Sequence, residues 1–381
     1  MPVPSGHYLA SIEVPHVIVT VTLNAALDLS YEVEGVSWDG MNQVRAPRYH
    51  AAGRGVTVAR VLNAFGHEVV AGGLAGGATG ELIKADLARS GVPTQFTRTG
   101  RDSRRVIWIT DTRLGTTACF REPAPYITTE ELGRFAADYR RLAKEATAVV
   151  LCGSLAAGLP PEIFGSLATY AADVGVPVVL HAAGSALGLG VARRPALVVP
   201  DVGPREHAPR ARELVAAGVG AVVTPSVDGI HAVATDEEWR AYGVLVGGAG
   251  SVGPVPANGP AAPVGAPPSF YARSSSATRS SSATQSPSAT ESLSATQSPS
   301  ATQSPFASPT PSDPESLIAS DWSGGARGAL VAGLVPGALL GWSWPDRLRH
   351  ALALAAAADP SGLIDIAAYE QFMADVIVER V

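Results

Sequence analysis

Gly53, Arg54 and Gly55 stand directly before an apolar run with helical spacing, and they carry the clearest chemical signal in the chain. Glycines at a helix entrance leave backbone N–H groups accessible, and these groups suit an anion because they lie at the positive end of the helix dipole. Arg54 adds a full charge at the same place. The segment therefore indicates either an anion site or a plain structural helix start.

Acidic and imidazole side chains give weaker signals. Asp28 leaves a predicted strand, where aspartate is a common turn former. Asp201 offers an oxygen of the kind that Mg²⁺ accepts, or equally a helix cap. His181, His207 and His231 lack the spacing of metal ligands, and no Ser-His-Asp or Cys-His arrangement is visible. Zinc and hydrolase chemistry are not expected.

The composition excludes several classes of partner. The 381 residues carry a net charge of −6 with scattered basic residues, so nucleic acid and anionic membrane surfaces are not expected to bind. No apolar stretch approaches the roughly 20 residues of a membrane span, and residues 1–16 do not resemble a signal peptide, so we expect a cytoplasmic protein. Cys119 and Cys152 lie in apolar segments and are expected to be buried free thiols.

Alternating strand-like and helical segments must position these residues. The predicted strands are 16–23, 68–73, 148–151, 176–181, 196–199 and 220–224. The predicted helices between them are 55–65, 80–90, 129–145, 161–174 and 205–217. This alternation predicts an α/β fold with a mostly parallel sheet covered by helices on both faces.

Two polar, extended segments interrupt the alternation. Residues 29–50 and 101–121 are assigned to a small accessory sheet. Near the end of the chain, residues 326–339, 344–357 and 367–379 are predicted helices of the same domain.

A low-complexity tract at 246–317 separates these last helices from the rest. Its second half repeats Ser-Ala-Thr every six residues, and it holds too few large apolar side chains to offset the entropy of ordering it. We therefore expect a disordered insertion between two parts of one domain, 17–245 and 318–381, after an N-terminal extension at 1–16.

Three motifs together carry a resemblance to a known family. Residues 22–28 resemble Thr-Leu-Asn-Pro-Ala-Ile/Leu-Asp, residues 52–59 resemble Gly-Gly-Lys-Gly-Ile-Asn-Val-Ala, and residues 153–160 resemble Gly-Ser-Leu-Pro-Pro-Gly-Leu-Pro. In this order they are similar to the phosphofructokinase B group of the ribokinase-like superfamily, in the branch with 1-phosphofructokinase and tagatose-6-phosphate kinase. The resemblance implies a three-layer fold in which the accessory sheet forms a lid.

The resemblance also implies a sugar-phosphate site. Arg104 would bind the substrate's existing phosphate, for which a planar guanidinium is well suited, although a solvated surface arginine is the alternative. Arg54 stands where the family has lysine, and Thr57 where it has asparagine. The implied substrate residues are Asn24, Asp28, Gly53, Arg54, Gly55, Thr57, Arg104 and Ser154.

The nucleotide side departs from the family pattern. The segment Lys-Pro-Asn-x-x-Glu reads 199–204 here as Val-Pro-Asp-Val-Gly-Pro, so its lysine and glutamate are missing. The segment Ser/Thr-Leu-Gly-x-x-Gly keeps only its ends. The nucleotide positions implied by resemblance are Asp201, Thr224 and Gly229, and no residue is assigned as a metal ligand.

The largest departure lies at 324–333, which aligns with the family's Gly-Ala-Gly-Asp-Ala-Leu-Val-Ala-Gly. Gly325, Ala326 and Arg327 occupy the anion-hole positions, and Gly328 occupies the position of the catalytic aspartate. Loss of a general base typically costs about 10² to 10⁴ in rate. Asp321, seven residues upstream of Gly328, is not expected to replace it.

Three hypotheses follow. The chain is a degenerate kinase relative, a pseudokinase that still binds a sugar phosphate or nucleotide as a sensor or regulator. Alternatively, it is a working kinase of a ketohexose phosphate that uses ATP and Mg²⁺, or a structural protein whose partner engages the insertion. The resemblance further implies a homodimer formed through the accessory sheet.

Overall fold

The computed structural model describes residues 17–201, 208–226, 228–244 and 323–381, which belong to one compact unit. The predicted extension at 1–16 and the insertion at 246–317 lie outside the described residues, as does Asp321.

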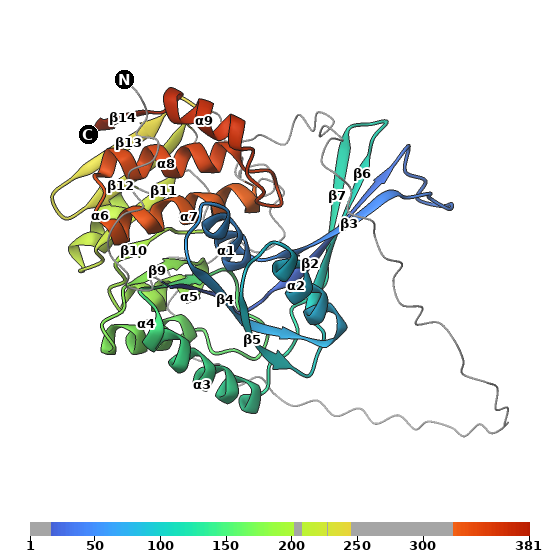
Figure 1. The fold of residues 1–381 in the computed structure, drawn as a ribbon, viewed down its shortest axis with the longest axis horizontal. Coiled ribbons are helices and arrows are strands. Elements are labelled where there is room, and N and C mark those ends of the chain that lie inside the picture. The colour runs from blue at the N-terminus through green and yellow to red at the C-terminus, as the bar shows by residue number, and fades with distance from the viewer. Residues whose placement is uncertain (1–16, 202–207, 227, 245–322) are drawn as a thin grey trace, which may run out of the picture. The chain divides into compact units, whose positions relative to one another are not determined.

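A ten-stranded sheet forms the centre of this unit, in the order β14-β13-β12-β11-β10-β9-β8-β1-β4-β5 (Figure 1). The strands from β5 to β11 run parallel, and β12, β13 and β14 continue the sheet antiparallel. The bounds are β1 Ile18–Thr22, β4 Val69–Gly76, β5 Thr94–Thr99, β8 Ala148–Cys152, β9 Val178–His181, β10 Leu197–Val198, β11 Ala221–Pro225, β12 Gly229–Ala234, β13 Glu238–Tyr242 and β14 Ile377–Arg380.

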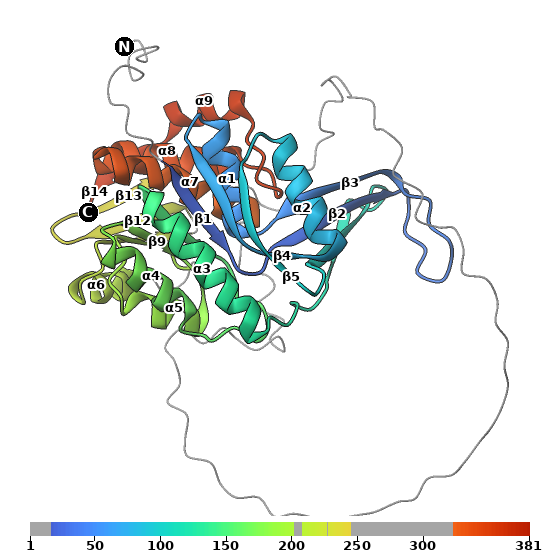
Figure 2. The same ribbon diagram turned by 60° about the horizontal axis from the view of Figure 1, so that its bottom comes forward.

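Helices cover both faces of the sheet (Figures 1 and 2). On one face lie α1 Arg54–Ala64, α2 Gly77–Arg89, α7 Gly324–Leu340, α8 Trp344–Ala357 and α9 Ile366–Asp375. On the other lie α3 Thr129–Glu145, α4 Ile163–Asp173, α5 Gly184–Val191 and α6 Ala208–Ala216. The predicted α/β fold is confirmed.

Alternate strand residues supply two separate cores. In β8, Val149 and Leu151 pack with the face covered by α3 and α4, whereas Val150 and Cys152 pack with the face covered by α1 and α7. All five residues of β8 are buried, as expected for a parallel strand between two helical layers. The apolar runs in the sequence are therefore continuous rather than alternating.

A four-stranded accessory sheet, in the order β3-β2-β6-β7, extends from one side of the unit (Figure 1). Its strands are β2 Ala26–Val33, β3 Arg45–Ala52, β6 Arg104–Asp111 and β7 Thr116–Arg121. The two extended segments predicted from the sequence are thus brought together. The pairing of β2 with β6 is parallel. The chain segment from α1 to β5 links the two halves of the lid, β2–β3 and β6–β7.

Local signals set some boundaries well. Helix α3 has the predicted bounds because Thr128 and Glu131 form a capping box at its start. The last predicted helix, at 367–379, is wrong at its end: α9 stops at Asp375, and β14 pairs with β13 instead. Cys119 is exposed, contrary to the expected burial, whereas Cys152 is buried, and both are free thiols.

No helix in the described part of the chain is long and apolar enough to cross a membrane.

A buried histidine holds the C-terminal helices against α1. His350 of α8 lies edge-on to Phe65, Trp342 and Tyr369, with ring centroids 5.5 to 5.8 Å away. Its Nδ1 and the Tyr369 hydroxyl form a 2.8 Å hydrogen bond. Burial, with a smaller effect of the His67 charge, lowers the pKa of His350 from 6.5 to about 4.

The chain is expected to lose stability below pH 6.5 because of His350. The unfolded chain takes up a proton near that pH, whereas the folded chain resists protonation down to about pH 4. His350→Gln should therefore flatten the pH dependence of the unfolding free energy by up to about 3 kcal/mol over this range. Denaturant melts at pH 4.5 to 7.5 measure it. Tyr369→Phe keeps the titrating group and should retain the slope; equal slopes in wild type and His350→Gln would contradict the assignment.

Candidate functional site

The predicted site residues gather at the carboxyl edge of the parallel strands. Asn24 follows β1, Gly153 follows β8, Asp201 follows β10, and Arg54 begins α1. Ligand sites of open α/β sheets commonly lie at this edge. Gly53 adopts a φ of 126°, which favours glycine and allows the chain to turn from β3 into α1.

Asp28 lies in the accessory sheet, opposite His50 in the β2–β3 pair. The Trp108 indole donates a 3.1 Å hydrogen bond to Oδ2 of Asp28, and the His50 Nε2 lies 3.9 Å from the same oxygen. Burial raises the pKa of Asp28 above its ordinary value, although His50 and Arg104 act in the opposite direction.

Arg104 opens β6, beside Ala26 of β2. Burial lowers the pKa of its guanidinium, while the nearby Asp28 charge raises it. Its Nε is buried and has no hydrogen-bond partner among the described residues. An arginine whose buried N–H group has no hydrogen-bond partner is suited to binding an anionic ligand.

Asn24 connects the loops that follow β1 and β8. Its Nδ2 donates to Oγ of Ser154 at 3.1 Å and to the Leu155 carbonyl at 3.4 Å. The Oδ1 of Asn24 is buried and has no partner within the described part of the chain. We call Asn24, Asp28, Arg104 and Ser154 the sugar-side residues.

Arg54, Asp201 and Arg327 form an ion cluster a short way along the same edge. Arg54 donates to both oxygens of Asp201 through Nε and Nη2, at 3.1 to 3.2 Å. Arg327 donates from Nη1 to Oδ1 at 2.5 Å. Two guanidinium groups thus share one carboxylate, although the three residues lie far apart in the sequence.

Burial alone would raise the pKa of Asp201, but the charges of Arg54 and Arg327 outweigh it and hold the pKa well below its ordinary value. His181, at the end of β9, adjoins the cluster and donates from Nδ1 to the Val199 carbonyl at 2.7 Å. Burial lowers the pKa of His181, so its ring is neutral near pH 7. The cluster therefore carries one net positive charge.

These residues do not fit a Mg²⁺ ion. Mg²⁺ prefers several oxygen ligands, usually with carboxylates free to coordinate it. Here Asp201 has both oxygens bound to arginine, and the described residues contain no group of three His, Cys, Asp or Glu side chains that could hold a metal. The two arginine charges would also repel the cation.

Gly328 lies where α7 meets α1, and it has no room for a side chain. A Cβ at this position would lie 2.5 Å from Cγ2 and 2.7 Å from Cβ of Thr57. Gly325 is similarly enclosed, since a Cβ there would lie 2.0 Å from the Asp359 carbonyl oxygen. Thr57 therefore occupies the space into which an aspartate at 328 would project.

Thr224 and Gly229 are held in the β11–β12 hairpin. The Thr224 hydroxyl donates to the His231 carbonyl at 3.4 Å. A Cβ at Gly229 would lie 2.0 Å from the Ala241 carbonyl oxygen of β13. These contacts account for both residues structurally, and their nucleotide role stays a prediction.

Comparison with known proteins identifies the family of this chain. Residues 19–200 match the pfkB family carbohydrate kinase. A 1-phosphofructokinase of Rhodobacter capsulatus is 34% identical over 218 residues, which cover 54% of this chain and 69% of that protein. This chain belongs to the pfkB family of carbohydrate kinases. The family expected from the sequence motifs is confirmed.

Solved structures support the fold. Phosphofructokinase-2 from Escherichia coli, in complex with substrates and products, has a TM-score of 0.66 at 19% identity and covers 94% of this chain and 98% of its own. The tetrameric inhibited form of the same enzyme has a TM-score of 0.65 at 19% identity, with the same coverage. At this identity the similarity concerns the pfkB fold alone.

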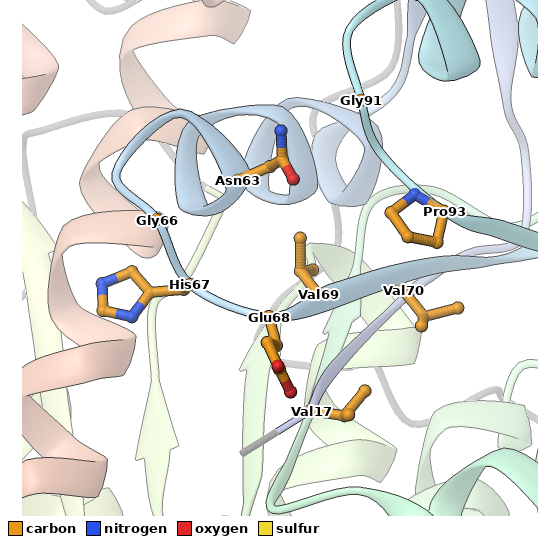
Figure 3. A pocket seen from close by; sticks show the side chains of 9 residues that line it. All are labelled: Val17, Asn63, Gly66, His67, Glu68, Val69, Val70, Gly91 and Pro93. Atoms are coloured by element: carbon orange, nitrogen blue, oxygen red, sulfur yellow. The ribbon is translucent and has the colours of Figure 1, made fainter. Parts of the chain in front are cut away.

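A pocket lies away from this edge (Figure 3). Its walls come from the segments that lead into β1, β4 and β5, so it lies at the opposite, amino end of the strands. It is lined by Val17, Asn63, Gly66, His67, Glu68, Val69, Val70, Gly91 and Pro93. None of the predicted site residues of this pfkB member takes part in it.

Sequence reasoning missed how the departures from the family fit together. The sequence pattern places Arg327 at an anion-hole position, and in the structure its side chain binds Asp201. Thr57 and Gly328 were treated as separate losses, yet they lie in contact distance across two helices. The sequence did contain a signal of these two contacts, because both residues of each pair differ from the family pattern.

Replacing Gly328 by alanine should destabilise the chain. At an uncrowded helix position, Gly→Ala stabilises the folded chain by roughly 0.5–1 kcal/mol. At position 328 the new methyl group would collide with Thr57, and such overpacking costs about 1–3 kcal/mol. Thr57→Gly should remove most of the cost in the double variant, as a double-mutant cycle would show. Gly133→Ala in α3 is the matched control, because nothing lies within 4 Å of its Cβ position. Stabilisation by Gly328→Ala would refute the close contact.

Proposed function

We propose that this pfkB family member binds a sugar phosphate and does not transfer a phosphoryl group. The observation that carries the proposal is the ion cluster, in which Asp201 is bound through both oxygens by Arg54 and Arg327. A carboxylate held in this way is neither a base for a hydroxyl nor a ligand for Mg²⁺.

The sugar-side residues support the binding half of the proposal. Asn24 offers a buried oxygen acceptor without a partner among the described residues, and Arg104 likewise offers a buried N–H donor. Buried polar atoms without partners are costly in a folded protein unless a ligand or water satisfies them. A phosphorylated sugar supplies hydroxyl donors for Asn24 and phosphate acceptors for Arg104, and would satisfy both groups.

The surroundings of Gly328 support the proposed absence of phosphoryl transfer. Phosphoryl transfer to a sugar hydroxyl needs a group that accepts its proton. Gly328 has no side chain, and the Thr57 methyl fills the space beside it. A catalytic aspartate at position 328 therefore needs substitutions of Thr57 and Arg327 as well as of Gly328.

Binding can be tested by calorimetric titration with fructose 1-phosphate, fructose 6-phosphate and tagatose 6-phosphate. We expect at least one to bind, and Arg104→Gln or Asp28→Asn to weaken its binding about tenfold or more, because each removes a charged hydrogen bond. Arg105→Gln is the matched control, since Arg105 is exposed and pairs with Glu122. Binding of none of the three sugars by wild type would refute the proposed function.

Turnover is tested by ADP release from ATP, Mg²⁺ and the sugar that binds. Wild type should give no ADP above background, and the double variant Arg327→Gly, Gly328→Asp should give none because Thr57 still blocks the new side chain. Adding Thr57→Gly should bring measurable activity. ADP release by wild type would instead favour an ATP-dependent and Mg²⁺-dependent sugar-phosphate kinase, which its 1-phosphofructokinase relative supports.

A homodimer through the accessory sheet is a separate proposal. Exposed apolar residues gather in the lid, where the Trp38 and Phe120 ring centroids are 6.3 Å apart. Both side chains are well exposed, as is Met41. A group of exposed apolar side chains commonly marks a protein–protein contact surface, and a second lid would cover it.

A further inference from the structure

His50 of β3 carries a polar atom that the protein leaves unused. Its Nε2 is buried and has no hydrogen-bond partner within the described part of the chain. His50 lies directly opposite Asp28 in the β2–β3 pair, so the two side chains share one face of the accessory sheet. A buried polar atom without a partner is costly unless a ligand or water satisfies it. His50 lies outside the sequence motifs, and its position beside Asp28 makes it a candidate for ligand contact.

The gap between the two side chains has the size of one hydroxyl oxygen. The Nε2 of His50 lies 3.9 Å from Oδ2 of Asp28, which is too far for a direct hydrogen bond. The Trp108 indole donates to the same oxygen at 3.1 Å and so helps to hold the carboxylate in its orientation. Two polar atoms at this separation can both lie about 2.8 Å from a single oxygen placed between them. The pair is therefore spaced for a bridging group.

The chemistry of the two side chains fixes the direction of each hydrogen bond. A carboxylate only accepts, so the single proton of a bridging hydroxyl goes to Asp28. Burial lowers the pKa of His50, although the Asp28 charge acts in the opposite direction, and the ring is therefore neutral near pH 7. A neutral imidazole donates from one of its ring nitrogens. With the hydroxyl proton directed at Asp28, His50 donates from Nε2 to the hydroxyl oxygen.

Two helices fix the strand at the residue that follows His50. The Ala51 N–H donates to Oδ2 of Asp86 in α2 at 2.7 Å, and the Ala51 carbonyl accepts from Nη2 of Arg60 in α1 at 3.1 Å. Arg60 and Asp86 are both buried, and they form an ion pair of 2.9 Å with each other. The backbone beside His50 is thus tied to the main unit before any ligand arrives. Groups held in place in this way bind with a smaller loss of entropy.

We propose that His50 is a further sugar-binding residue, which holds one hydroxyl of the bound sugar phosphate together with Asp28. The hydroxyl donates to the Asp28 carboxylate and accepts from Nε2 of His50. The inference rests on the proposed function, because it assigns a contact within the sugar side. One donor and one acceptor in fixed positions select for the presence and the direction of a single hydroxyl, so His50 contributes to the choice of sugar. An analogue without that hydroxyl leaves both side chains unpaired and is bound weakly.

The experiment is a calorimetric titration with whichever of fructose 1-phosphate, fructose 6-phosphate and tagatose 6-phosphate binds most tightly, and with analogues of it that each lack one hydroxyl. We expect His50→Phe, which keeps a ring but removes the donor, to bind the intact sugar about tenfold more weakly than wild type. His50→Gln keeps an N–H donor and should stay within about threefold of wild type. His67→Phe is the matched control, since His67 is a partly buried histidine at the opposite end of the strands.

The analogues separate a direct contact from a structural role of His50. One analogue should bind wild type about tenfold more weakly than the intact sugar, and the same analogue should cost His50→Phe at least about threefold less, because its donor is already gone. Equal losses in both proteins for every analogue, or unchanged binding of the intact sugar by His50→Phe, overturn the role of His50 and leave sugar-phosphate binding established. Absence of binding by wild type overturns both proposals. If thermal melts show that His50→Phe does not fold, His50→Ala takes its place, because it removes the same donor without a bulky ring.

Discussion

The close approach of α1 and α7 is the constraint on which the site depends. Their starts meet at positions where no Cβ fits: Gly328 lies against Thr57, and Gly324 lies against Arg54. Glycine is the residue that permits such contact between backbone and side chain. Because the helices touch here, arginines from opposite ends of the chain reach the same carboxylate at Asp201.

The two halves of the carboxyl edge differ in how their polar groups are satisfied. On the sugar side, Arg104 and Asn24 keep buried atoms without partners in the described residues. On the other side, Arg54 and Asp201 are bound to each other. Polar groups that are already paired gain little from a ligand, whereas unpaired ones gain a full hydrogen bond. This contrast supports the proposal that the chain binds a sugar phosphate without phosphoryl transfer.

The cores on the two faces of the sheet keep this edge rigid. Strands such as β8 are buried on both sides, so their ends are fixed in relation to α1 and α7 on one face and to α3 and α4 on the other. Core packing of this density does not deform gradually. The ion cluster is thus held in place by the scaffold.

The sequence by itself determined the α/β architecture, most of the parallel strands and most boundaries of the predicted helices. Those depend on apolar periodicity and on caps such as Thr128 and Glu131, which act over a few residues. It also showed that Gly328 and Arg327 depart from the family pattern. It did not predict β5, α5, β12, β13 or β14. Strand β14, an edge strand with exposed residues, is defined by its pairing with β13.

Only the tertiary structure decided what those departures mean. The contact of Gly328 with Thr57 and the binding of Arg327 to Asp201 join residues more than a hundred positions apart. Apolar periodicity and local propensity do not reveal contacts between residues so far apart in the sequence. Such contacts follow from how the helices pack on the sheet. The sequence identified the residues that depart from the family pattern, and the tertiary structure showed that these residues contact one another.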